Sequence, residues 1–350
     1  MKKTGTGSFC YENQPLIIGY ASVAGSKEGE GPLGKQIDRV FEDNLLGEDT
    51  WEKAESRLIQ EAVNLCIDKA KLTTHDIDAI YSGDLLNQCV ASTFGLRSFS
   101  IPDVGMYGAC STMALTLITA SIMLDAGGAD KCIAATSSHF SSAERQYRMP
   151  LQYGNQRPPT AQWTVTGAGA IALTNNIKEA KNGEHAGERR VAVKRATLGI
   201  VRDLGVKDAN NMGAAMAPAA ADTISRFMHD HGASPEQYDM ILTGDLGAVG
   251  STLLIELLQK EGMDMSHKHC DGGLMIYDRE GQDVHAGGSG CGCSAVVMCS
   301  EILPKMEREE LKRVLFVATG ALLSPTTSLQ GEPIPAVAHA VELESVMLEK

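Results

Sequence analysis

Hydrophobic and polar positions follow two kinds of pattern along the chain. Residues 51–70 place Ala54, Leu58, Ala62 and Leu65 about one helical turn apart, which predicts an amphipathic helix. Short apolar runs at 77–81, 132–136 and 165–173 predict buried strands. Residues 1–50 and 140–160 lack a clear period. We expect irregular polar segments there, with a surface loop at 25–32.

The alternation of strands and helices restarts after residues 174–190, a charged stretch that contains glycine. Strands are expected at 191–193, 240–243, 314–318 and 336–342, and helices at 212–230, at 252–261 and after a glycine turn at 286–292. The pattern therefore predicts two halves, residues 1–178 and residues 190–350.

Three short motifs recur in the same order in both halves. Residues 77–85 resemble 238–246, residues 109–111 resemble 292–294, and residues 134–136 resemble 317–319. Each match is weak alone, because glycine-rich turns of α/β proteins look alike, but together they favour an internal duplication. Two copies of a strand–helix unit predict an α/β fold of five αβαβα layers, with helices between and outside two sheets.

Composition and charge narrow the classes of function. The 350 residues are 43% hydrophobic and 5% aromatic, and a net charge of −13 argues against nucleic acid as a partner. The sequence leads us to expect no signal peptide and no membrane-spanning segment, since residues 1–7 are polar and no apolar run is long enough to cross a bilayer. Nine irregularly spaced cysteines are typical of reduced thiols rather than a disulfide framework.

The strongest chemical candidate is Cys110. Residues 105–117 predict a tight glycine turn that opens into an apolar helix, with Cys110 and Ser111 at its start. There the helix dipole favours a thiolate, and free backbone N–H groups can hold an anion. The alternative is that Cys110 is a small buried hydrophobe in a packing turn.

The Gly-Ala-Cys-Ser turn at 108–111 and the glycine-interrupted strand at 166–173 resemble the thiolase superfamily of thiolases and ketoacyl synthases. The resemblance implies a cysteine that is acylated, assisted by a histidine and by an asparagine or second histidine. Here Asp245 stands at the histidine position and Ser289 at the asparagine position. A carboxylate beside Cys110 opposes a thiolate and raises its pKa. We therefore expect a ligand-binding protein that is not an enzyme and has no cofactor. The alternative is an acyltransferase that uses Cys110 as its nucleophile.

Within that superfamily the chain resembles the stage V sporulation protein AD family over nearly its whole length. The motifs that carry this resemblance lie at 31–34, 83–88, 136–139, 143–146, 214–223, 242–246, 273–277 and 318–325. The resemblance implies a protein that binds dipicolinic acid. It works with membrane proteins of the same sporulation operon to move the acid, with calcium, into the developing spore. It also implies a peripheral location on the cytoplasmic side of the spore inner membrane, and analogy suggests a homodimer.

A site for this planar dianion needs donors at both ends and an apolar slot between them. The helix start at Cys110 and Ser111 could hold one carboxylate, and Arg145, Arg148 or Arg157 the other. For each arginine, the better alternative is a solvated salt bridge. Three more candidates follow strands: Asp84, Asp245 and the group Ser137, Ser138 and His139. Asp84 and Asp245 could bind calcium or a protonated ligand, or only cap turns, and His139 could equally be a core histidine.

A second cluster of histidines and cysteines has residue types that suit zinc. It contains His267, His269, Cys270, His285, Cys291 and Cys293. The cluster has neither a Cys-x-x-Cys pair nor a His-x-x-x-His pair, so we expect no metal.

Overall fold

The ten principal strands follow one another in a single path, five from each half. The computed structural model describes residues 1–147, 157–181 and 189–348. The strands of the first half are β3 (Leu16–Ala24), β5 (Ala79–Gly83), β6 (Asp103–Gly105), β7 (Lys131–Ser138) and β9 (Gly167–Thr174). Those of the second half are β10 (Arg189–Thr197), β11 (Met240–Thr243), β12 (His269–Asp271), β14 (Arg313–Ala321) and β15 (Ala336–Met347).

The two halves have the same sheet topology. The order is β6-β5-β7-β9-β3 in one and β12-β11-β14-β15-β10 in the other, so corresponding strands occupy corresponding places. In each sheet only the strand that comes last along the chain, β9 or β15, runs antiparallel to its neighbours within that sheet. The sheets meet where Ile17 pairs with Val191 and Leu16 with Ala192. The duplication that the repeated motifs predicted is visible in this topology.

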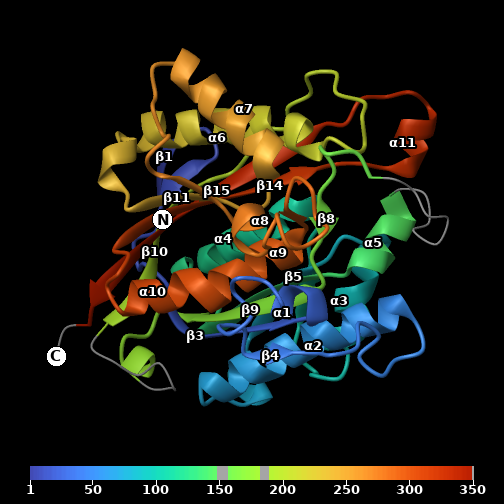
Figure 1. Cartoon of the computed structure of the whole chain (residues 1–350). Helices are drawn as coiled ribbons and strands as arrows, with labels where there is room; N and C mark the ends of the chain where they lie inside the picture. Colours follow the sequence, from blue (N-terminus) through green and yellow to red (C-terminus); the bar gives the residue numbers. More distant parts are fainter. Residues whose placement is uncertain (148–156, 182–188, 349–350) are drawn as a thin grey trace.

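Helices cover both sheets and fill the space between them (Figure 1). The outer face of the first sheet carries α2 (Trp51–Lys69), and α3 (Val90–Leu96) packs beside it. The second sheet carries α6 (Met212–His231), against which α7 (Gly247–Lys260) packs. Between the sheets lie α4 (Thr112–Asp125), α9 (Cys291–Val297) and α10 (Leu303–Glu307). The predicted five-layered αβαβα fold is confirmed.

The predicted helix at 51–70 forms for the expected reasons. Thr50 caps α2 by accepting a hydrogen bond from the backbone N–H of Lys53. Ala54, Leu58 and Ala62 are fully buried and form the face that packs on the first sheet.

The expectation that residues 1–50 are irregular is wrong. The nine residues of β3 are all buried, at the end of the first sheet that adjoins the second. A strand covered on both faces shows a continuous apolar run instead of an alternating one. The same region contains β1 (Lys2–Gly5), β2 (Ser8–Cys10) and β4 (Arg39–Val40), and α1 (Ser26–Gly29) lies in the predicted surface loop.

The expectation of a loop at 140–160 is also wrong where the structure describes it. Residues Phe140–Tyr147 form α5, whose buried face is mostly polar, so no apolar period marks the helix. The Ser142 hydroxyl donates to Glu55 (2.5 Å), and Glu144 accepts from Thr164 (3.1 Å). These polar contacts, rather than hydrophobic burial alone, hold α5 in place.

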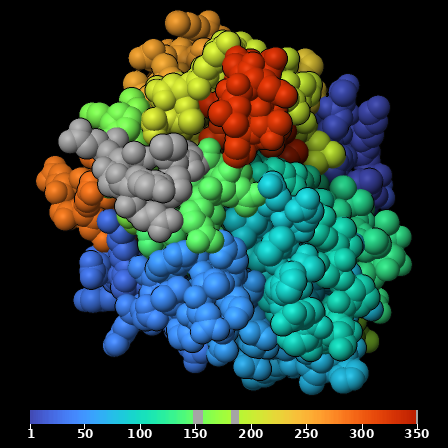
Figure 2. Space-filling view, turned by 90° about the vertical axis from the view of Figure 1, so that its right-hand side faces the viewer, coloured from blue at the N-terminus to red at the C-terminus, as the bar shows by residue number. Residues whose placement is uncertain are grey.

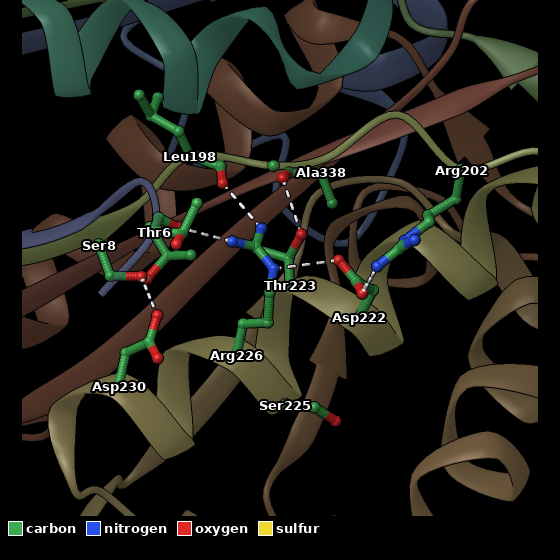
Figure 3. A network of polar contacts seen from close by, with 12 residues as sticks. Thr6, Ser8, Leu198, Arg202, Asp222, Thr223, Ser225, Arg226, Asp230 and Ala338 are labelled. Carbon is green, nitrogen blue, oxygen red and sulfur yellow. Dashed lines mark hydrogen bonds and ion pairs between the residues drawn. The ribbon is translucent and has the colours of Figure 1, made fainter. Parts of the chain in front are cut away.

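A polar network fixes α6 against the N-terminal strands (Figure 3). Arg226 donates to the carbonyls of Thr6 (3.0 Å) and Leu198 (2.8 Å) and forms an ion pair with Asp222. Ser8 donates to Asp230, at 2.6 Å. The network positions the helix whose first residue, Met212, reaches the candidate site.

A second, two-stranded sheet pairs β8 (Trp163–Thr164) with β13 (Gly288–Ser289), so that Thr164 lies opposite Ser289. Two short helices, α8 (Gly272–Met275) and α11 (Pro325–Leu329), complete the second half. In Figure 2 the red surface around α11 lies directly above the cyan surface of the first half, so both halves share this face. Over the described residues, no helix is long and apolar enough to cross a membrane.

Candidate functional site

A cleft opens between the two halves at the start of α4. The cleft is narrow, because the space inside it that the centre of a water-sized sphere can occupy is only about 20 Å³. Its walls are mainly apolar, with a thiol and three hydroxyl groups among them. The lining residues are Leu85, Ala109, Cys110, Tyr147, Thr164, Met212, Ser289, Ala321 and Leu323.

Cys110 lies in a single three-residue helical turn, Ala109–Ser111, directly ahead of α4. The turn is tight: Ala109 has a φ of +51°, which residues with a side chain rarely adopt. It is also pressed against β14, since a Cβ at Gly320 would lie 2.1 Å from the Gly108 carbonyl oxygen. Only glycine at 320 lets the second-half strand approach the backbone of Cys110 this closely.

The Cys110 thiol begins a short polar chain that leads away from the cleft. Cys110 Sγ lies 3.8 Å from Ser289 Oγ. Ser289 donates to Asp245 Oδ2 (3.1 Å), and the N–H of Gly290 donates to the same oxygen (2.7 Å). All three side chains are buried. The structure therefore brings together three of the predicted site residues, Cys110, Asp245 and Ser289.

The electrostatics of this chain disfavour a thiolate. Burial raises the pKa of Asp245 to about 7, although the Gly290 N–H partly offsets the effect. The pKa of Cys110 is raised well above its ordinary value, first by burial and then by the charge of Asp245. Near neutral pH, Cys110 is a neutral thiol beside a carboxyl group that titrates.

A pair of tyrosines lies beside the cleft, and one of them, Tyr147, lines it. The hydroxyl of Tyr147, at the end of α5, lies 2.8 Å from that of Tyr107, which precedes the cysteine turn. Burial raises the pKa of Tyr107 to about 12, and that of Tyr147 is also raised by burial. Sequence reasoning missed Tyr147, Thr164 and Met212, because each lies on an element that was not predicted or at an element's first residue.

Asp84 is buried but points away from the cleft. Its carboxylate accepts hydrogen bonds from the backbone N–H groups of Leu86 (2.8 Å) and Ser92 (2.7 Å), and from the Ser92 hydroxyl. Burial raises its pKa. Asp84 thus ties the end of β5 to α3, the capping role that the sequence left open.

Ser137 and His139 also point away from Cys110. Ser137 Oγ lies 3.4 Å from Glu55. His139 is fully buried, with Nε2 2.9 Å from the Asn44 carbonyl oxygen and Nδ1 3.1 Å from the Ser141 nitrogen. Burial lowers the pKa of His139 to about 4, so the ring is neutral at physiological pH. This is the geometry of a satisfied core histidine.

The arginines that the structure describes lie outside the cleft. Arg145 forms an ion pair with Glu52 and lines a separate, open hollow beside α3. Arg157 pairs with Asp283 (2.6 Å) and stacks over Trp163. Arg148 lies outside the described residues. Ser111 is buried in the cysteine turn, where its hydroxyl donates to the Gly108 carbonyl (2.6 Å).

The residues proposed and rejected as a zinc cluster are dispersed. His269 bonds to Thr243, whereas Cys291 bonds to the Ser137 carbonyl. Among the residues that the structure describes, no group of three or more histidine, cysteine, aspartate or glutamate side chains could hold a metal ion.

Comparison with known proteins places the chain in a family. A family model described as stage V sporulation protein AD matches residues 5–344. The stage V sporulation protein AD of Bacillus subtilis (strain 168) is 44% identical over 344 residues, 98% of each chain. The chain belongs to the stage V sporulation protein AD family. The resemblance noted in the motifs is confirmed, and with it a role among sporulation proteins.

Solved structures relate this family's fold to condensing enzymes. The 3-oxoacyl-(acyl-carrier-protein) synthase III of Aquifex aeolicus VF5 matches 94% of this chain and 99% of its own, with a TM-score of 0.54 and 13% identity. A human mitochondrial 3-ketoacyl-CoA thiolase in complex with CoA matches 97% and 99%, with a TM-score of 0.59 and 12% identity. At such low identity these matches establish the thiolase-like fold alone.

Proposed function

We propose that the protein binds dipicolinic acid in the cleft above Cys110 and acts in the uptake of dipicolinate, with calcium, into the developing spore. Membership in a sporulation protein family supports a role in spore formation. The resemblance in the motifs implies dipicolinic acid as the ligand. The observation that carries the proposal is the polar chain Cys110–Ser289–Asp245, which ends in a buried carboxyl group at the position where the resemblance to ketoacyl synthases implies a histidine.

The lining of the cleft has the chemistry for a flat aromatic acid with two carboxylates, although the cleft would have to widen to admit one. Leu85, Met212 and Leu323 supply apolar surface for the ring. Tyr147, Thr164 and Ser289 place hydroxyl groups in the same cleft, and each could donate to a ligand carboxylate after turning from its present partner, Tyr107, Glu144 or Asp245. In this arrangement Cys110 forms part of the wall and does not attack the ligand.

The same features argue against retained acyl transfer. The raised pKa of Cys110 leaves almost no thiolate at neutral pH. No histidine lines the cleft within the part of the chain that the structure describes. The protein is on this account a condensing-enzyme scaffold that has become a binding protein.

The proposal extends to partners. The protein would act peripherally, on the cytoplasmic side of the spore inner membrane, with membrane proteins of the same operon. A homodimer would form at the edge strand β6, whose residues Asp103–Gly105 are all exposed and have no second partner strand among the residues that the structure describes. Light scattering should give twice the chain mass, and Val104→Lys should reduce it to that of a monomer.

Calorimetric titration with dipicolinate, with and without calcium, tests the ligand. We expect saturable binding at one site. Picolinate, which has one carboxylate, should bind at least tenfold more weakly, because a hydrogen bond to a charged group contributes about 1.5–3 kcal/mol. Ser289→Ala should weaken binding similarly, while Ser225→Ala, a substitution outside the cleft, should leave it unchanged. Absence of heat at millimolar dipicolinate in both conditions would contradict the proposal.

A further inference from the structure

Asp245 and Asp271 are two buried acids beside the cleft, and their hydrogen bonding differs. Both oxygens of Asp271 are fully engaged: Leu246 N–H and Thr243 Oγ1 bond to Oδ2, each at 2.7 Å, and Gly247 N–H (2.9 Å) and Leu274 N–H (3.2 Å) to Oδ1. In Asp245, Oδ2 accepts from Gly290 N–H (2.7 Å) and Ser289 (3.1 Å), whereas the Thr319 hydroxyl approaches Oδ1 only to 3.4 Å. The weakly donating thiol of Cys110 also interacts with this carboxyl group. Hydrogen bonds therefore stabilise the ionised form of Asp271 more than that of Asp245.

The groups that face Asp245 come from each element packed against it. The thiol of Cys110 interacts with Asp245 from the turn before α4, and Ser289 and the N–H of Gly290 bond to it from β13 and the start of α9. The charge of Asp271 acts on it from β12, and the thiols of Cys291 and Cys293 interact with it from α9. These titratable neighbours are all acids. Within the described residues, no lysine, arginine or histidine lines the cleft.

A dicarboxylate that enters this cleft therefore adds charge to a buried acidic site. Carboxylic acids have ordinary pKa values near 4, so such a ligand is a dianion at neutral pH. Two more negative charges beside a charged Asp245, with low-dielectric walls and no cation, would be strongly unfavourable. The least costly adjustment is for Asp245 to take a proton on Oδ1, its poorly bonded oxygen.

We propose that the cleft binds its dicarboxylate together with one proton, which is taken from solvent and held on Asp245. The inference rests on the proposed function, since it concerns the same cleft and class of ligand. Protonation removes one negative charge from the site. It also weakens the hold of Asp245 on the Ser289 hydroxyl, which is then free to turn toward the cleft and donate to a ligand carboxylate. Asp245 thus sets the protonation state in which the site accepts its ligand.

Wild-type protein tests this without any substitution. Dipicolinate is titrated at pH 8 in phosphate and in Tris, two buffers with different ionisation enthalpies, and the difference in heat gives the number of protons taken up. We expect about one proton per ligand, and an apparent Kd that rises about tenfold between pH 8 and pH 9. Ligand carboxylates do not titrate in this range.

Two variants assign the proton to its residue. Asp245→Asn is neutral at every pH, so it should bind dipicolinate with no proton uptake and with a Kd that does not change between pH 8 and pH 9. Glu28→Gln is the matched control, because Glu28 is also fully buried with a raised pKa but lies outside the cleft. It should behave like the wild type.

The outcomes separate this inference from the proposed function. Normal binding with no proton uptake by the wild-type protein would overturn the inference and leave dipicolinate binding intact. Proton uptake that persists in Asp245→Asn would also overturn it. Absence of binding at both pH 6 and pH 8 would contradict the proposed function, and the inference with it.

Discussion

Cys110 Sγ lies 3.8 Å from Ser289 Oγ, and this contact joins the first half of the chain to the second at the candidate site. Ser289 in turn donates to Asp245. The thiol at the head of α4 therefore has a carboxyl group behind it, where the resemblance to ketoacyl synthases implies a histidine. Its surroundings favour a neutral, unreactive thiol.

The reactivity of Cys110 should be low. Its pKa is raised well above the ordinary value by burial and by Asp245, so little thiolate is present at pH 8. With iodoacetamide at pH 8, the partly exposed Cys10 should be modified much faster than Cys110, as measured by peptide mass spectrometry. Incubation with acyl-coenzyme A should add no mass to Cys110. A stable acyl adduct that turns over would support the alternative acyltransferase function.

Asp245→Asn should change how stability depends on pH. The folded-state pKa of Asp245 is raised to about 7, so between about pH 4 and 7 the folded state binds more protons than the unfolded state. Its contribution to stability therefore falls as pH rises through that window. Asparagine does not titrate, so the variant does not lose this stability. Relative to the wild type, its free energy of unfolding should therefore rise by roughly 3 kcal/mol between pH 5 and pH 8. Urea unfolding at both pH values measures this, and a constant difference would refute the assignment.

Asp84→Ala should reduce stability without affecting the acid–base behaviour of the cleft. The substitution leaves the N–H groups of Leu86 and Ser92, which are buried, without their acceptor. An expected loss of roughly 1–3 kcal/mol in the free energy of unfolding follows. Denaturant unfolding compares it with Asp76→Ala, an exposed capping aspartate whose removal should cost less. Equal losses would show that Asp84 has no special structural role.

Arg145→Ala and Arg157→Ala should leave dipicolinate affinity within about twofold of the wild-type value. The guanidinium groups are engaged by Glu52 and Asp283, and neither residue lines the cleft. Calorimetry at low and high salt separates a direct contact from a general effect of charge. A tenfold loss in either variant would mean that the arginine reaches the ligand.

The sequence predicted the fold because the duplication leaves pairs of motifs, and equivalent motifs occupy equivalent places in the two sheets. It also brought Cys110, Asp245 and Ser289 together correctly, since turns at the ends of neighbouring elements meet at one edge. It could not predict the direction of a side chain. Asp84 and Asp245 follow equivalent strands, yet Asp84 turns toward α3, where Ser92 offers donors.

Elements held by polar contacts were missed for a related reason. The helix α5 buries Ser142 and Glu144, whose partners Glu55 and Thr164 are distant in sequence. The local pattern of hydrophobic positions cannot reveal contacts between residues that are far apart in the sequence. Tyr147, which lines the cleft, is the last residue of this helix. Because the helix was not predicted, Tyr147 was not predicted as a site residue either.

The central claim is that the cleft above Cys110 holds a dicarboxylate, and a crystal structure with dipicolinate tests it most directly. We expect difference density for a flat ring among Leu85, Met212 and Leu323, with one carboxylate within hydrogen-bond distance of Ser289 and no covalent bond to Cys110. Density for the ligand elsewhere with this cleft empty, or density continuous with the Cys110 sulfur, would contradict the account.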